Sequence, residues 1–88
     1  MKIIYKYEIP VGGGNIKMPY VSTALSVGVQ NGSLMLWAEV DPDSSDVTSR
    51  FEVFGTGHDI PEDMGVSRRL IGTAFMDSLV WHVYERFH

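Results

Sequence analysis

The sequence predicts an all-β fold, a small antiparallel barrel or sandwich of about six to seven short strands. Apolar and polar residues alternate with a period of two in several segments, and no segment shows convincing helical periodicity. The dipeptide Asn31-Gly32 separates two alternating runs, a pattern typical of a tight hairpin. Because 88 residues leave room for one modest core, we expect a single all-β domain over residues 1–88.

The first half of the chain contains four predicted strands. Residues 2–9 place four apolar or aromatic side chains on one face, which is typical of a half-buried strand. The glycines at 12–14 are predicted to form a flexible connection, since nothing after them continues into the helix that a phosphate-binding loop requires. Residues 15–21 form an edge strand or an irregular segment, because Pro19 has no backbone N–H.

The hairpin of residues 24–30 and 33–40 is the strongest local prediction, because both central residues of its turn need positive φ. Its two strands place Met35, Trp37 and Glu39 on one face. The residues predicted to share the apolar faces are Leu25, Val27, Val29, Leu34, Leu36, Ala38 and Val40.

The second half is predicted to hold a polar loop at 41–49 and strands at 50–55, 69–76 and 79–87, the last two joined by a turn at Asp77-Ser78. In the strand at 50–55, Phe51 and Val53 face inward. The last strand is partly apolar on both faces, so it is either buried on both sides or contacts a partner on one. A helix from Ser78 is the alternative for this segment, but Val80, Val83 and the two-residue turn favour a strand.

Composition excludes several classes of protein. There is no cysteine, so a disulfide framework or thiolate metal site is impossible, and a reducing cytoplasm fits this composition. No run is long and apolar enough to span a membrane, and the start does not resemble a signal peptide. The net charge of −4 argues against duplex nucleic acid as a partner. The acidic groups, which we interpret as solvated loops, are Asp41, Asp43, Asp46, Asp59, Glu62 and Asp63.

Catalytic patterns are missing, so we expect no enzymatic activity, no metal and no cofactor. His58, His82 and His88 have no short spacing to one another or to a carboxylate that is typical of a metal site. The sequence contains no Gly-x-Ser-x-Gly motif and no cysteine nucleophile.

Residues suited to binding lie on the reverse faces of the predicted strands. Three sets combine aromatic area with polar groups, which suits a planar ligand or a protein partner. These sets are Met35 with Trp37, Arg50 with Phe54, and His82 with Tyr84. In the alternative interpretation, these residues form the second face of a closed barrel or an oligomer interface. The adjacent pair Arg68 and Arg69 suits a phosphate or carboxylate, or is simply solvated surface.

The loop after the strand at 50–55 also allows two interpretations. Successive amides of Gly55, Thr56, Gly57 and His58 are able to form an anion-binding nest, with Thr56 and His58 adding side-chain donors. Alternatively, the glycines form a bulge and turn that leave the strand, ended by Pro61.

Four segments of the chain carry a family resemblance. They are residues 4–10, which read "IYKYEIP", and residues 25–42, 51–61 and 71–85, and the most specific parts are "LWAEVDP" and "GTGHDIP". The chain resembles a family of small uncharacterised proteins that are common in bacteriophages and prophages. It departs from that pattern at the insert 12–14 and in the extended "EDMGVSRR" at 62–69.

The resemblance implies phage origin and small size, and it favours the nest at Gly55–His58. Accessory phage proteins of this kind often act on host immunity by binding. We therefore expect a homo-oligomeric sponge in the host bacterial cytoplasm that sequesters a small anionic, cyclic-nucleotide-type signal. Its expected ligand-binding residues are Trp37, Arg50, Gly55, Thr56, Gly57, His58, Arg68 and Arg69. The alternatives are an anti-CRISPR-like protein inhibitor of a defence complex and a minor phage structural or morphogenetic protein.

Overall fold

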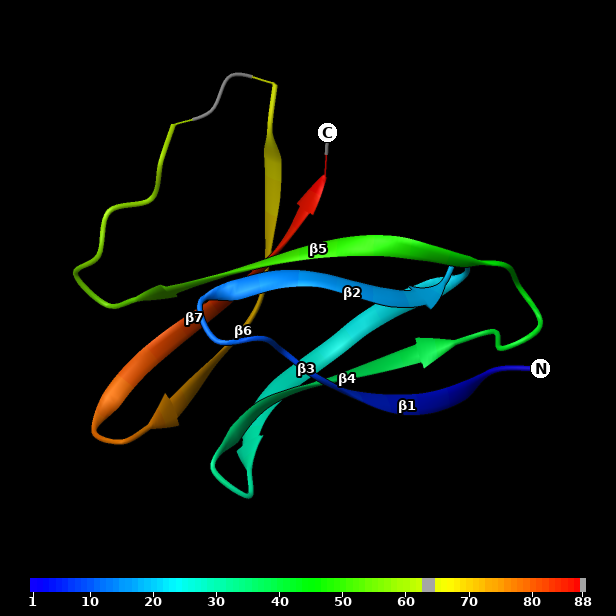
Figure 1. The fold of residues 1–88 in the computed structure, drawn as a ribbon, viewed down its shortest axis with the longest axis horizontal. Helices are drawn as coiled ribbons and strands as arrows, with labels where there is room; N and C mark the ends of the chain where they lie inside the picture. The colour runs from blue at the N-terminus through cyan, green and yellow to red at the C-terminus, as the bar shows by residue number, and fades with distance from the viewer. Residues whose placement is uncertain (63–64, 88) are drawn as a thin grey trace.

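The computed structural model describes residues 1–62 and 65–87. Asp63, which belongs to a predicted acidic loop, and His88, the third histidine, lie outside the described residues, as does Met64. The described residues form seven strands and no helix, which confirms the predicted all-β class (Figure 1). The strands are β1 (Ile3–Glu8), β2 (Gly13–Pro19), β3 (Ser22–Gln30), β4 (Ser33–Val40), β5 (Asp46–Gly55), β6 (Ser67–Met76) and β7 (Leu79–Phe87).

Two antiparallel sheets form a small sandwich rather than a closed barrel. A three-stranded sheet has the order β1-β4-β3, and a four-stranded sheet has the order β2-β5-β7-β6. The strands β3 and β6 lie against each other where the two sheets meet. Apolar side chains from both sheets form one core between them, and its buried residues are Ile9, Ile16, Met18, Leu34, Leu36, Ala38, Val40, Phe51, Ala74 and Val83.

The hairpin β3–β4 confirms the local turn signal. Asn31 has φ 53° and Gly32 has φ 77°, as a two-residue turn with positive φ at both positions requires. The alternate residues of β4, from Leu34 to Val40, are buried as predicted, because they face the other sheet. On β3 the prediction fails at Leu25. A bulge between Ala24 and Ser26 shifts the register, so Leu25 is 47% exposed while Val27 packs against the core.

The strands β2 and β5 both begin earlier than the sequence predicts. β5 starts at Asp46, inside the predicted polar loop, and β2 starts at Gly13, inside the predicted flexible connection. The two strands pair with each other antiparallel over this extra length, with Gly13 opposite Glu52 and Pro19 opposite Asp46. A Cβ atom on Gly13 would lie 2.7 Å from the carbonyl oxygen of Phe51, so only glycine permits this close approach. β2 is an edge strand, which is one of the two places predicted for Pro19.

β7 is a central strand and has apolar side chains on both faces. β7 lies between β5 and β6, so its backbone is paired on both sides. On one face Val83 is fully buried in the core, and on the other Tyr84 packs against Phe54. These contacts cover part of the strand, while Leu79 and Phe87 stay 54% and 41% exposed, so contact with a partner stays a prediction. The turn before β7 is confirmed at Asp77-Ser78, both with positive φ.

Candidate functional site

The surface of the four-stranded sheet that points away from the core, called the outer face below, carries most of the predicted polar binding residues. Phe51 and Val83 point into the core, so their strand neighbours point outward. The cross-strand register then fixes how these outward residues line up. Those on the three strands β5, β7 and β6 are Arg50, Glu52, Phe54, His82, Tyr84, Arg86, Arg68, Leu70 and Thr73.

One row across the outer face consists of three arginines. Arg50 on β5 lies opposite Arg86 on β7, and Arg86 lies opposite Arg68 on β6. Lys17 on β2 is exposed on the same face. Four of the seven lysines and arginines of an otherwise acidic chain therefore lie on this face. Like charges directly opposite one another destabilise a sheet, so a negatively charged group near this row stabilises it by reducing the repulsion between the arginines.

Glu52 supplies part of that compensation from within the chain. The Nε of Arg68 donates to Glu52 Oε1 at 2.6 Å, and its Nη2 donates to Oε2 at 3.4 Å. Arg86 Nη1 lies 3.9 Å from Glu52 Oε2. The side chains of Arg68, Glu52 and Arg86 are only 13%, 16% and 20% exposed, so this is a partly buried network with a bidentate pair. Arg50 is exposed, and its guanidinium makes no ion pair with any of the described residues.

An aromatic pair lies beside the arginine row, with Tyr84 in the next row of the register and Phe54 in the row after that. The rings of Phe54 and Tyr84 meet edge to face, with centroids 5.9 Å apart. The guanidinium carbon of Arg68 lies 5.9 Å from the centre of the Phe54 ring. The outer face therefore places cationic donors next to aromatic area on one sheet.

His82 is held between two threonines on the same face. Its Nε2 lies 2.8 Å from Thr56 Oγ1, and its Nδ1 lies 3.0 Å from Thr73 Oγ1. A threonine hydroxyl donates or accepts, so both ring nitrogens are satisfied in either neutral tautomer. Thr73 and Arg86 also belong to this surface, although the sequence did not single them out. The turn at 77–78 offered a signal, because a two-residue hairpin there places residue 73 opposite His82.

The loop after β5 forms a closed turn. The amide of Gly55 donates to His58 Nδ1 at 3.3 Å, and the amide of His58 donates to the Gly55 carbonyl at 3.0 Å. The amide of Thr56 donates to the Val80 carbonyl at 3.0 Å. Three of the four amides that the nest interpretation requires therefore have acceptors inside the chain. Gly57, with φ 88°, supplies the positive φ of the turn.

This turn fixes the tautomer of His58 and the identity of Gly55. Because His58 Nδ1 accepts a hydrogen bond, the proton of the neutral ring lies on Nε2. A Cβ atom on residue 55 would lie 2.7 Å from His58 Cε1, so the imidazole occupies the space that only glycine leaves free. The imidazole also meets the Trp81 ring edge to face, with centroids 6.0 Å apart. The hydrogen bonds thus favour the turn as the role of this backbone, and ligand binding by its side chains stays a prediction.

The remaining predicted residues lie on other surfaces. Trp37 is on the outside of the three-stranded sheet, where its ring packs over Gly28. Arg69 points to the opposite face of β6 from Arg68, where it pairs with Glu85 at 3.4 Å and lies over the Phe87 ring. The structure therefore brings Arg50, Arg68 and Thr56 onto one face and leaves Trp37 and Arg69 elsewhere.

Two further findings concern metal sites and membrane-spanning helices. Within residues 1–62 and 65–87, no three histidine, aspartate or glutamate side chains gather closely enough to hold a metal ion. The same residues include no helix long and apolar enough to cross a membrane.

Comparison with known protein families matches residues 1–88 to DUF7352, a domain of unknown function. The match covers the whole chain, so the protein belongs to this family. Comparisons with curated proteins and with solved structures find no match.

Proposed function

We propose that this protein is a binding protein without catalytic activity that captures a small anionic ligand of the cyclic-nucleotide type on the outer face. The observation that carries the proposal is the row Arg50–Arg86–Arg68 beside the Phe54–Tyr84 pair. A phosphate needs cationic donors, and a base needs aromatic area, so one nucleotide needs both close together.

The spacing between Arg50 and Tyr84 supports a ligand of this size. Arg50 on β5 and Tyr84 on β7 are diagonal neighbours in the register, and such pairs lie about 7–8 Å apart. A phosphate at Arg50 and a base over Tyr84 are then separated by little more than one sugar. Arg50 is the donor best placed for the phosphate, because it is exposed and makes no ion pair with a described residue.

The state of the titratable groups on this face fits binding rather than catalysis. Glu52 already accepts from Arg68, and both nitrogens of His82 are engaged by threonines. A general acid or base has to exchange its proton with the substrate, whereas these groups hold the surface in place. We further propose that the ligand is a signal of host antiviral defence and that the protein sequesters it in the host bacterial cytoplasm, as the phage-family resemblance implies. The sponge is expected to be a homo-oligomer.

The test is native mass spectrometry and calorimetry of the protein with a panel of cyclic di- and trinucleotides. We expect stoichiometric uptake of one panel member, and the mass of the complex gives the number of subunits. Arg50→Gln should weaken that binding about tenfold or more, because it removes a charge-assisted contact to phosphate. Lys2→Gln is the matched control, since it removes the same charge from an exposed side chain that lies near Glu39 on the other sheet.

Two outcomes would contradict the proposal. If the whole panel fails to bind, the sponge is wrong, and salt-sensitive binding to a defence protein would then support the inhibitor alternative. If both variants lose affinity equally, the ligand responds to net charge and the outer face is not its site.

A further inference from the structure

The strand β1 has a free edge. Within residues 1–62 and 65–87, β1 pairs only with β4, while β3, the other edge of that sheet, lies against β6. In Figure 1, β1 (blue) runs along the rim of the molecule, beside β4. The edge strand β2 is less suited to accept another strand. Its Tyr20 amide bonds to the Ser45 carbonyl, so the alternate position that faces the free edge is Pro19, which has no N–H.

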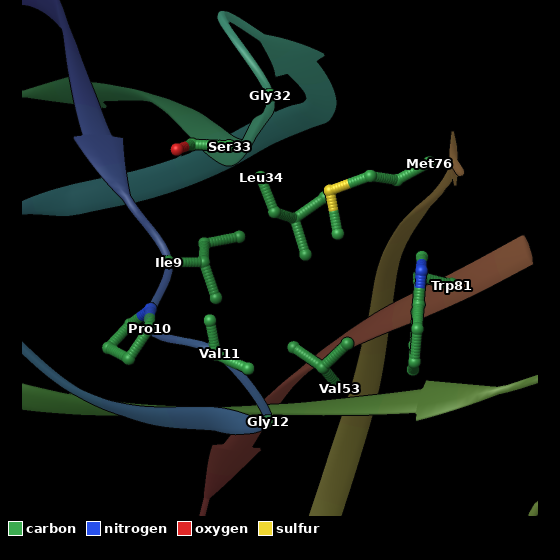
Figure 2. Close-up of a pocket in the computed structure, with 10 residues that line it drawn as sticks. All are labelled: Ile9, Pro10, Val11, Gly12, Gly32, Ser33, Leu34, Val53, Met76 and Trp81. Atoms are coloured by element: carbon green, nitrogen blue, oxygen red, sulfur yellow. The ribbon is translucent and has the colours of Figure 1, made fainter. Parts of the chain in front are cut away.

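Every second residue of β1 directs its backbone groups to the free edge. The amide of Ile9 donates to the Leu34 carbonyl at 2.9 Å, and Figure 2 shows both side chains in the wall of the cavity at this end of the sandwich. Hydrogen-bonded positions alternate along an antiparallel pair, so Tyr7, Tyr5 and Ile3 also bond to β4. The residues whose backbone groups are left for a further strand are Lys2, Ile4, Lys6 and Glu8.

The side chains of β1 are much more exposed than those of β4 beside it. Tyr5 lies opposite Ala38 on the core side of the sheet, yet Ala38 is fully buried and Tyr5 is 41% exposed. The second sheet therefore covers β4 and leaves part of β1 uncovered. On the reverse side of β1, Ile4 is 61% exposed. A strand added at this edge covers apolar area on both faces and also pairs the free backbone groups.

The charges of β1 match a second copy of β1. An antiparallel copy centred on Tyr5 places Lys2 opposite Glu8 of the second copy, and Glu8 opposite its Lys2. The free backbone groups also face one another in this register, as an antiparallel ladder requires. A shift of two residues in one direction places Lys2 opposite Lys6, and the same shift in the other direction places Lys6 opposite Lys6. Of the registers with long overlap, the centred one is thus the one that pairs opposite charges and separates like ones.

Both charged groups are available for this contact. Glu8 is exposed and makes no ion pair with a described residue. Lys2 Nζ lies 3.7 Å from Glu39 Oε1, and both side chains are exposed. An ammonium group has three N–H donors, so this weak surface pair leaves donors for a second carboxylate.

We propose that β1 is a dimer interface, at which a second copy of this chain adds its own β1 antiparallel about a two-fold axis at Tyr5. Three strands from each copy then form one continuous six-stranded sheet. The two Tyr5 side chains meet on the axis, and Ile3 of each copy lies opposite Tyr7 of the other. The interface gives the homo-oligomer expected above a surface, yet it does not rest on nucleotide binding, because the outer face belongs to the other sheet.

The first test places a cysteine on the axis. The chain has no cysteine, so Tyr5→Cys introduces a single thiol. At a non-hydrogen-bonded pair its Cα lies roughly 4.5 Å from that of the second copy, within the range of a disulfide. Ile4→Cys is the matched control, because Ile4 is more exposed but its two copies are diagonal neighbours about 7–8 Å apart, which a disulfide does not span. We expect mild oxidation to cross-link Tyr5→Cys about tenfold faster than Ile4→Cys on non-reducing gels.

The second test exchanges the charges and measures dimerisation in a dilution series by analytical ultracentrifugation, without nucleotide. Lys2→Glu and Glu8→Lys each place like charges opposite one another at both ends of the interface, so each variant should dimerise about tenfold more weakly than the parent protein. A mixture of the two variants restores both opposite-charge pairs in the heterodimer. With one variant ¹⁵N-labelled, native mass spectrometry should therefore show mainly heterodimers. Lys17→Glu on β2 is the control, because it makes the same charge change away from β1 and should leave dimerisation unchanged.

Three results would overturn the proposal. A parent protein that stays monomeric over the whole dilution series would leave the β1 edge to a strand of another protein. Cross-linking of Ile4→Cys as fast as Tyr5→Cys would mean a different register or random collision. A mixture of the charge variants that dimerises no better than each variant alone would exclude the pairing of Lys2 with Glu8.

The two proposals for this protein fail separately. If Tyr5→Cys does not fold, the charge exchange still tests the interface, because it leaves every apolar side chain in place. A parent dimer that takes up no cyclic nucleotide contradicts the nucleotide site alone. A monomer that takes up nucleotide contradicts the β1 interface alone.

Discussion

At the scale of single residues, the turn after β5 shows how a side chain takes the place of a backbone carbonyl as a hydrogen-bond acceptor. The Gly55 amide is at the buried end of β5, and its acceptor is the imidazole of His58 three residues later. A histidine in this loop thus has a local structural role that its sequence context does not reveal. The same contact also accounts for Gly55, because any side chain there would meet the imidazole.

His58→Ala therefore distinguishes the two interpretations of the loop. We expect it to lower the free energy of unfolding by about 1–2 kcal/mol, because it leaves the Gly55 amide without an acceptor. Nucleotide affinity should change little if the loop is only a turn. Urea unfolding and calorimetry on the same variant measure both quantities. Asp59→Ala is the control, since it truncates the neighbouring exposed residue. A tenfold loss of affinity without loss of stability would establish the loop as a ligand site.

At the scale of strands and turns, local signals predicted well and distant pairings did not. The hairpin β3–β4 and the turn at 77–78 follow from short-range patterns that need no other part of the chain. The early start of β5 at Asp46 depends on its pairing with Pro19 of β2, which lies 27 positions earlier, so no local sequence pattern predicts it. The arginine row likewise exists only because β7 lies between β5 and β6.

Alternation alone would have improved the site prediction. Arg68 and Arg69 are neighbours in a strand, so they point to opposite faces and cannot both contact one ligand on the sheet. Trp37 and Arg50 belong to different sheets. To predict that they lie apart, one needs to know which strands form each sheet, and local sequence patterns do not give this.

The β6–β7 turn carries strain that a substitution should relieve. Asp77 and Ser78 have φ values of 52° and 62°, a conformation that non-glycine residues adopt at a cost of roughly 1 kcal/mol. Ser78→Gly should therefore raise the free energy of unfolding by about 0.5–1 kcal/mol in urea titrations, and Ser78→Ala should not. The reverse change in the other hairpin, Gly32→Ala, should lower stability. Equal stability of Ser78→Gly and the parent protein would show that the hairpin accommodates this strain elsewhere.

At the scale of the whole molecule, two sheets share one core and should behave as one cooperative unit. The tryptophans report on the sheets separately, because Trp37 lies on the three-stranded sheet and Trp81 on the four-stranded one. Labelling with 5-fluorotryptophan gives each sheet its own ¹⁹F signal. We expect the two signals to lose their folded intensity at the same urea concentration. Separated midpoints would show that the sheets unfold independently and would contradict a single domain.

The central position of β7 also constrains the order in which the fold is made during translation. β5 and β6 do not pair with each other, and β7 joins them. As the ribosome releases the chain from its N-terminal end, β1, β3 and β4 are able to complete their sheet first. β6 waits without any hydrogen-bonded neighbour until β7 emerges, and its exposed Leu70 and Phe75 are then at risk of contact with other nascent chains. The short Asp77-Ser78 turn limits the time for which β6 is unpaired, because its partner β7 is the next strand to leave the ribosome.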